Sequence, residues 1–287
     1  MQAIDFECGT IATRDDVRLH YIEAGSGTPL VFIPGWSQTA AMFRFQLEGL
    51  RERFHVIAID MRGHGKSDKP AHGYRIARLA ADLHDALDAL ELSGVILAGH
   101  SMGCSVIWSY LEQFGESRIS KLILIDQAPV ITARRAWTEQ EKADYGSIFT
   151  AQDLFDAVEK FEGPGALLET RKFIEKRFFT PAFPQQMIDW VTAENLQMPR
   201  PLAARLLLDH GAQDWRDAIT RIRLPSLVVG AEKSLFTVAS QKWIAASIRG
   251  AELQIFNESE GGSHFMWLEN PSRFNELAQA FACRPPP

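Results

Sequence analysis

The chain has 287 residues, 46% of them hydrophobic and 23% charged, a balance typical of one large, well-packed domain with room for an inserted subdomain. Its formal net charge of −6 gives no reason to expect a nucleic acid partner. No apolar run approaches the ~20 residues of a transmembrane helix, and "MQAIDFECGT" has no signal-peptide pattern, so we expect a cytoplasmic protein with no membrane partner. The three cysteines, Cys8, Cys104 and Cys283, are too widely spaced for a disulfide framework or a metal site, so we expect free thiols.

The first part of the chain alternates strand-like and helix-like segments. Residues 17–25 alternate apolar and polar side chains, as a half-buried strand does. From Leu79 to Leu90, leucines recur at helical spacing with polar residues between them. Four other runs are almost wholly apolar, as strands covered on both faces are: 29–34, 54–60, 94–99 and 121–126. This alternation predicts an α/β fold, with a mostly parallel sheet flanked by helices.

The alternation breaks between residues 131 and 213. That segment has no strand-like run and is rich in Phe and Trp, so we expect a helical cap over the carboxyl edge of the sheet. Strand-like runs return at 225–230 and 251–256, and Asn270 and Pro271 mark the start of a final helix. The sequence thus predicts a core of residues 1–130 and 214–283, a cap of residues 131–213, and a tail of residues 284–287.

The stretch "GHSMG" (99–103) stands between the apolar run 94–99 and a helix-like segment. A serine at such a junction sits on a tight turn with its hydroxyl exposed, and Gly99 and Gly103 keep side chains out of the crowded approach. The helix N-terminus also offers free backbone N–H groups to a developing oxyanion. We therefore interpret Ser101 as a nucleophile, the alternative being a serine that only caps the helix.

A nucleophilic serine needs a base, and the best-placed histidine is His264. It follows the last strand-like run and the pair Gly261-Gly262, where a flexible loop can reach the sheet edge. Other histidines are less well placed: His20 and His55 lie in strand-like runs, and His64 lies in a turn. His100 is next to the serine and could line the site. A loop histidine without chemistry is the alternative interpretation of His264.

These motifs together resemble the α/β-hydrolase superfamily. The matching segments follow the family's order and span nearly the whole chain outside the predicted cap: "FIPGW" (32–36), "DMRGHGKSDKP" (60–70), "GHSMG" (99–103), "LILID" (122–126), "RIRLPSLVV" (221–229) and "GSHFMWLENPSRF" (262–274). The resemblance implies the α/β-hydrolase fold with a helical cap after its sixth strand. It also implies Ser101 as nucleophile, His264 as base, and an oxyanion hole made by the backbone N–H groups of Trp36 and Met102. It makes Asp60 a residue of a structural turn. We expect no cofactor and no metal, because the mechanism needs neither and the histidines form no ligand cluster.

The third member of the catalytic group is left open between two carboxylates. Most of the family place an aspartate shortly after the strand that matches 225–230, but Ser234 stands near that position. Glu232 is close by, although it is displaced and next to Lys233, which could pair with it. Asp126, at the end of "LILID", is the other place, and we favour it over Glu232 as the residue that holds the imidazole.

The resemblance implies a serine hydrolase, and the aromatic residues of the predicted cap favour a small apolar or aromatic substrate with an ester or lactone bond. Ser101 argues against the haloalkane dehalogenases and epoxide hydrolases of the fold, which use an aspartate there. We expect Trp36, Gln38, His100 and Trp137 to contact the substrate. The sequence says nothing of the oligomeric state.

Two alternatives remain. Cofactor-free dioxygenases that cleave 3-hydroxy-4-quinolone rings share the fold, the "PGW" stretch at 34–36 and an acid after "LILI". This chain departs from them at Gln38 and Met102, where we expect histidines. The other alternative is a non-catalytic ligand receptor on the same fold.

Overall fold

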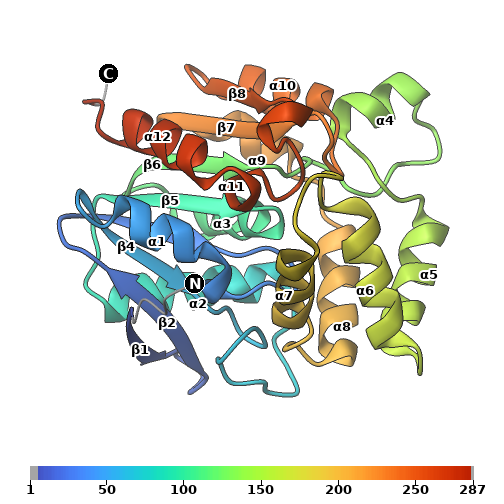
Figure 1. Ribbon diagram of the computed structural model, residues 1–287, viewed down its shortest axis with the longest axis horizontal. Coiled ribbons are helices and arrows are strands. Elements are labelled where there is room, and N and C mark those ends of the chain that lie inside the picture. Colours follow the sequence, from blue (N-terminus) through green and yellow to red (C-terminus); the bar gives the residue numbers. More distant parts are fainter. Residues whose placement is uncertain (1–5, 286–287) are drawn as a thin grey trace.

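The structure, a computed structural model, describes residues 6–285, and within this range the strands form one eight-stranded sheet (Figure 1). The strand order is β1-β2-β4-β3-β5-β6-β7-β8. β1 and β2 are antiparallel to their neighbours, whereas all pairs from β4 to β8 are parallel. Their bounds are Glu7–Ala12 (β1), Arg18–Ala24 (β2), Thr28–Ile33 (β3), Phe54–Ile59 (β4), Val95–His100 (β5), Ile119–Ile125 (β6), Ser226–Ala231 (β7) and Glu252–Phe256 (β8).

Seven of these strands were predicted from the sequence, and all seven are confirmed with shifts of at most two residues at either end. β1 was not predicted. It is an edge strand in which only Ile11 is buried, so it carries almost none of the apolar signal that marks a strand in a sequence.

Both faces of the parallel part of the sheet are covered, as the continuous apolar runs require. In β3, Val31 and Ile33 pack on one side while Leu30 and Phe32 pack on the other. The first side carries α2 (Ile76–Ala89), α3 (Met102–Phe114), α9 (Arg216–Arg221) and α10 (Val238–Ser247). The second carries α1 (Arg44–Leu50), α11 (Met266–Glu269) and α12 (Pro271–Ala282). Asn270 caps α12 through a bond from the backbone N–H of Arg273, as its sequence indicated.

Six helices lie between β6 and β7 in the chain, and the first five of them fall within residues 131–213, where the sequence predicted helices and no strand. In Figure 1, α5, α6, α7 and α8 stand together beyond one end of the sheet. The bounds are Glu139–Tyr145 (α4), Ala151–Glu162 (α5), Ala166–Arg177 (α6), Gln185–Asn195 (α7) and Arg200–Gly211 (α8). We refer to α4–α8 as the helical insertion. The division of the chain into a core and a separate cap stays a prediction.

Asp60 holds the turn that follows β4. Its carboxylate accepts hydrogen bonds from the backbone N–H groups of Ala40 (2.7 Å) and Lys66 (3.0 Å), and it lies 2.9 Å from Nδ1 of His20. A side chain at Gly65, where φ is +45°, would collide with this carboxylate. Asp60 is therefore a residue of the fold, as the sequence indicated.

Arg284, the first residue of the predicted tail, contacts the core. Arg284 forms an ion pair with Glu252, and its carbonyl oxygen accepts a hydrogen bond from the buried ammonium of Lys121. Residues 286–287 of that tail lie outside the described part of the chain. Within residues 6–285, Cys8, Cys104 and Cys283 are free thiols, and no helix is long and apolar enough to cross a membrane.

A buried ion pair between α2 and the turn after β4 gives a test of the fold. The fully buried guanidinium of Arg62 pairs with the equally buried Asp82 at 2.8 Å. Asp82→Ala should lower the free energy of unfolding by roughly 3–5 kcal/mol, because it strips a buried cation of its buried partner. Asp88→Ala, on the same helix but in an exposed pair with Arg118, should cost less than about 1 kcal/mol. Urea unfolding of both variants checks this, and equal losses would contradict it.

Candidate active site

The turn between β5 and α3 presents Ser101 at the carboxyl edge of the sheet. Ser101 has φ 53° and ψ −125°, a conformation that L-residues seldom adopt. A Cβ on Gly103 would collide with the carbonyl oxygen of Ile33, and one on Gly99 would lie 2.7 Å from the backbone nitrogen of Cys104. The two glycines thus let α3 approach β3 and β5 closely enough to make the turn. This is the tight strand–turn–helix junction that the sequence predicted.

His264 and Asp126 come together from two distant loops. Nδ1 of His264 lies 2.6 Å from Oδ2 of Asp126, and both side chains are buried. Asp126 directly follows β6 and has φ 48°, while its backbone N–H donates to the carbonyl of Val229 on β7. The left-handed conformation turns the carboxylate out of the strand direction and toward the histidine loop.

Ser234 is a member of this group that the sequence analysis did not propose. Its hydroxyl donates to the same Oδ2 of Asp126 and accepts from the backbone N–H of Phe236 at 3.1 Å. Ser234 stands at the position where the family more often has its aspartate. The sequence signal that favours Asp126 over Glu232 is a serine at this position, since its hydroxyl can donate to a carboxylate that the neighbouring strand supplies.

Glu232 lies away from the imidazole. It is exposed, and its carboxylate accepts from the backbone N–H of Glu258 at 3.2 Å. Lys233 pairs with Glu258 at 3.4 Å and not with Glu232. Of the two acids that the sequence left open, the structure therefore places Asp126 on His264.

Ser101 and His264 open into one small cavity of about 40 Å³. Among the hydrogen bonds of residues 6–285, none joins their side chains directly, and in many enzymes this bond tightens only in the complex with substrate. The cavity walls are mainly apolar and come from both the sheet loops and the helical insertion: Trp36, Ile131, Ile148, Phe149, Phe173, Phe178, Leu207, Leu235 and Phe236. The polar groups that line it are Gln38, Ser101, His210 and His264.

Two backbone N–H groups flank Ser101. Met102 is the first residue of α3, and Trp36 follows β3 in the loop that presses on the serine. A Cβ on Gly35 would lie 3.0 Å from Cβ of Ser101. Among the loop and cap hydrogen bonds of residues 6–285, none has the backbone N–H of Trp36 or Met102 as its donor. Both N–H groups are therefore available to a bound molecule. The indole of Trp36 is held by a 2.7 Å bond from Nε1 to the carbonyl of Ala203 on α8.

Gln38 lines the cavity with a fixed amide. The backbone N–H of Gly35 can only donate, so the side-chain atom 2.9 Å from it must be the oxygen Oε1. The same oxygen lies 2.8 Å from Nδ1 of His100. With Oε1 so engaged, the NH₂ group of Gln38 is left to donate to a molecule in the cavity.

Two residues that we expected to contact substrate lie elsewhere. His100 is completely buried behind Gln38, with Nε2 2.8 Å from the backbone carbonyl of His264, because its side chain points away from that of Ser101 across the turn. Trp137 precedes α4 and packs against Tyr145 and the guanidinium of Arg216, outside the cavity. An aromatic residue in a helix-rich segment can face either a cavity or a neighbouring helix, and sequence alone did not separate the two.

Burial sets the protonation of the histidine. It lowers the pKa of His264 from its usual 6.5 to about 3, which favours the neutral imidazole that can accept a proton at pH 7. Burial raises the pKa of Asp126, and the bond from Ser234 opposes this by stabilising the carboxylate. The arrangement can therefore take a proton from a hydroxyl beside it and stabilise the resulting charge.

Comparison with known proteins bears on the fold that carries this site. Residues 28–155 match the family model described as the alpha/beta hydrolase fold. The chain is 27% identical to the AB hydrolase superfamily protein YisY of Bacillus subtilis over 95% of its own length and 98% of the relative. It is 28% identical to the non-heme chloroperoxidase CPO-A1 of Kitasatospora aureofaciens, over 88% and 90%. The solved esterase EaEST of Exiguobacterium antarcticum superimposes with a TM-score of 0.87 at 27% identity, covering 96% and 99%. The chain has the α/β-hydrolase fold.

The placement of Asp126 can be tested through the reactivity of Ser101. Asp126→Asn should slow labelling of Ser101 by a fluorophosphonate by orders of magnitude, since the same change in a Ser-His-Asp group lowers kcat about 10⁴-fold. Glu232→Gln should label within a few-fold of the unmodified protein, because Glu232 is exposed and remote from the imidazole. Labelling rates followed by mass spectrometry, with circular dichroism as the control for folding, measure this. Slow labelling of the Glu232→Gln protein together with an unchanged labelling rate of the Asp126→Asn protein would contradict the assignment of Asp126 as the acid.

Proposed function

We propose that the protein is a serine hydrolase that cleaves an ester or lactone bond of a small apolar or aromatic molecule. The observation that carries the proposal is that Ser101, held on a strained turn, lines the same apolar cavity as His264, and that His264 lies against Asp126. The similarity to the esterase EaEST over nearly the whole chain supports the same reaction class.

The reaction has two halves. Neutral His264 takes the proton of Ser101 as the hydroxyl oxygen attacks the carbonyl carbon, and Asp126 stabilises the imidazolium that forms. The imidazolium then protonates the leaving oxygen as the C–O bond breaks, which leaves an acyl-Ser101. Water attacks the acyl group with His264 again as base, and the released acid regenerates the serine.

Three hydrogen-bond donors stabilise the substrate and the oxyanion that forms from its carbonyl group. The N–H groups of Trp36 and Met102 bind the tetrahedral oxygen, and each such donor is typically worth roughly 3–4 kcal/mol in the transition state. The NH₂ group of Gln38, oriented by Gly35 and His100, donates to the substrate from the side. Trp36 contributes its ring to the apolar wall.

One observation favours a second candidate, the cofactor-free dioxygenase. The acid on His264 is Asp126 at the end of β6, as in the quinolone-cleaving branch, and a His-Asp pair can deprotonate a substrate hydroxyl there without a covalent intermediate. Gln38 and Met102 in place of histidines weigh against it. The role of the serine hydroxyl separates the two reactions.

Ser101→Ala distinguishes them quantitatively. For a hydrolase the change should lower kcat on an ester or lactone by on the order of 10⁶, because every turnover passes through acyl-Ser101. For a dioxygenase the serine only orients the substrate, so the loss should be about ten- to a hundred-fold, the worth of one hydrogen bond to an ionised group. The assay follows acid release in a pH-stat and O₂ in an electrode on esters, lactones and 3-hydroxyquinolones.

We expect the large loss, with no O₂ uptake. A modest loss with continued O₂ consumption would replace the hydrolase with the dioxygenase. A protein that labels with fluorophosphonate but turns over no substrate in the panel would favour the receptor.

A further inference from the structure

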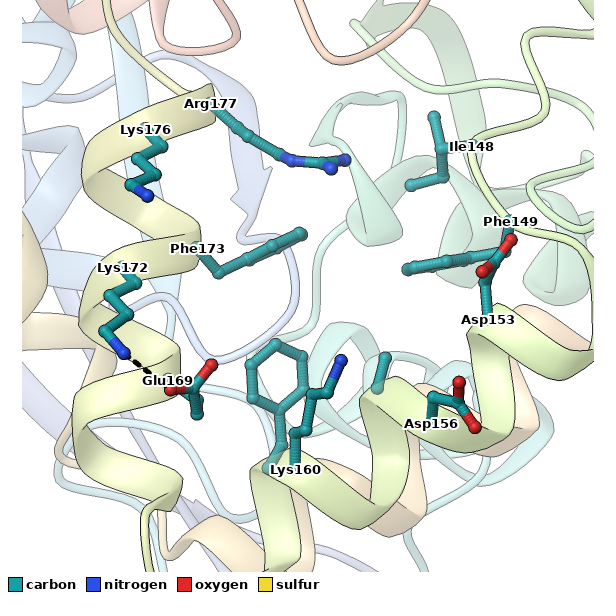
Figure 2. A pocket seen from close by; sticks show the side chains of 12 residues that line it. Ile148, Phe149, Asp153, Asp156, Lys160, Glu169, Lys172, Phe173, Lys176 and Arg177 are labelled. Atoms are coloured by element: carbon teal, nitrogen blue, oxygen red, sulfur yellow. Dashed lines mark hydrogen bonds and ion pairs between the residues drawn. The ribbon is translucent and has the colours of Figure 1, made fainter.

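A large cleft adjoins the small cavity at Ser101. It has a volume of about 460 Å³ and lies between α5 and α6 of the helical insertion (Figure 2). Three of its lining residues, Ile148, Phe149 and Phe173, also line the inner cavity. In Figure 2 the rings of Phe149 and Phe173 point toward one another across the cleft. The two spaces therefore meet at an aromatic constriction, with Ser101 on the inner side.

Three cations that line the outer space have no ion-pair partner among the described residues. Lys160, Lys176 and Arg177 line it, and within residues 6–285 no carboxylate lies within ion-pair distance of any of them. Arg177, the last residue of α6, extends into the cleft in Figure 2, with its guanidinium 5.7 Å from the ring of Phe173. The next residue, Phe178, lines the inner cavity with its ring 4.8 Å from that of His264. Arg177 thus stands at the entrance to the catalytic cavity.

The carboxylates of the cleft are already engaged. Glu169 pairs with Lys172 at 2.9 Å. Asp153 accepts from the backbone N–H of Thr150 at the start of α5, and Asp156 accepts from Gln152. With four cations and three carboxylates, the formal charge of the lining is +1 in a chain whose net charge is −6. The cleft therefore attracts anions where the molecule as a whole repels them.

We propose that the substrate carries a carboxylate at the end remote from the bond that is cleaved, and that Arg177 binds it in the outer cleft. The planar guanidinium suits a carboxylate, which it binds through two parallel hydrogen bonds. The apolar middle of the substrate passes between Phe149 and Phe173, and the ester or lactone carbonyl reaches Ser101. The substrate class is thus an amphiphilic carboxylic acid that bears an ester or lactone. This inference rests on the proposed hydrolase function.

The first test compares matched ester pairs. Mono-p-nitrophenyl esters of straight-chain dicarboxylic acids are set against p-nitrophenyl esters of monocarboxylic acids of equal chain length. The protein should prefer the half-ester through a lower KM at the chain length that spans the two sites. Arg177→Gln should reduce this preference, the ratio of the two kcat/KM values, by about ten- to a hundred-fold, since one hydrogen-bonded charge is removed.

Arg171→Gln is the matched control. It removes the same side chain and charge from the same helix, but Arg171 pairs with Glu175 outside the cleft, so the preference should stay within about two-fold. A preference that is absent, or that survives Arg177→Gln, overturns the inference. Equal loss in both variants also overturns it, because the effect would then be one of overall charge.

A binding measurement separates this inference from the proposed function. Octanoate titrated into the protein in a calorimeter needs no turnover, and Arg177→Gln should weaken its binding at least about ten-fold, whereas Arg171→Gln should not. Arg177-dependent binding without any ester hydrolysis would remove the hydrolase and keep the carboxylate site. Hydrolysis of neutral esters without Arg177-dependent binding would keep the hydrolase and remove the site.

Discussion

The contact between the Asp126 carboxylate and the His264 imidazole is the constraint on which the rest of the site depends. It joins residues 138 positions apart, one at the end of β6 and the other in the loop after β8. Since β7 lies between these two strands, the contact forms only when three parallel strands end at the same edge in the observed register. The left-handed backbone at Asp126 and the Ser234 hydroxyl then aim the carboxylate, because an unanchored buried carboxylate could not hold one tautomer of the imidazole.

The opposite side of the site depends on close backbone packing. Ser101 keeps a strained conformation because β3, β5 and α3 surround it, and Gly99 and Gly103 are the positions where any side chain would prevent that approach. The same packing brings the loop after β3 against the serine, so that Trp36 and Gln38 line the cavity. Stability and catalytic geometry are therefore set by the same contacts, and strain at Ser101 is tolerated because the surrounding sheet over-determines it.

The helical insertion places an apolar surface and a charged surface near the carboxyl edge of the sheet. Its inner surface, with Phe173 and Phe178, completes the mainly apolar lining of the cavity at Ser101. Its outer surface, between α5 and α6, is wide and charged. An apolar chamber at the nucleophile and a cationic cleft beyond it together favour an amphiphilic substrate over a wholly apolar one, which composition alone did not indicate.

The sequence by itself determined the strands that are buried on both faces, the serine turn and the final helix, because each is encoded by a short local pattern of apolar residues, glycines or caps. It missed β1, whose single buried residue leaves no such pattern. It favoured Asp126 as the acid but kept Glu232 as the alternative, since the choice depends on which strand end lies beside His264. It also misplaced His100 and Trp137, because helical spacing and chain proximity do not say which face of an element meets the cavity. Only the tertiary structure decided these points, since register, strand order and helix packing bring distant residues within contact while leaving neighbours in the chain apart.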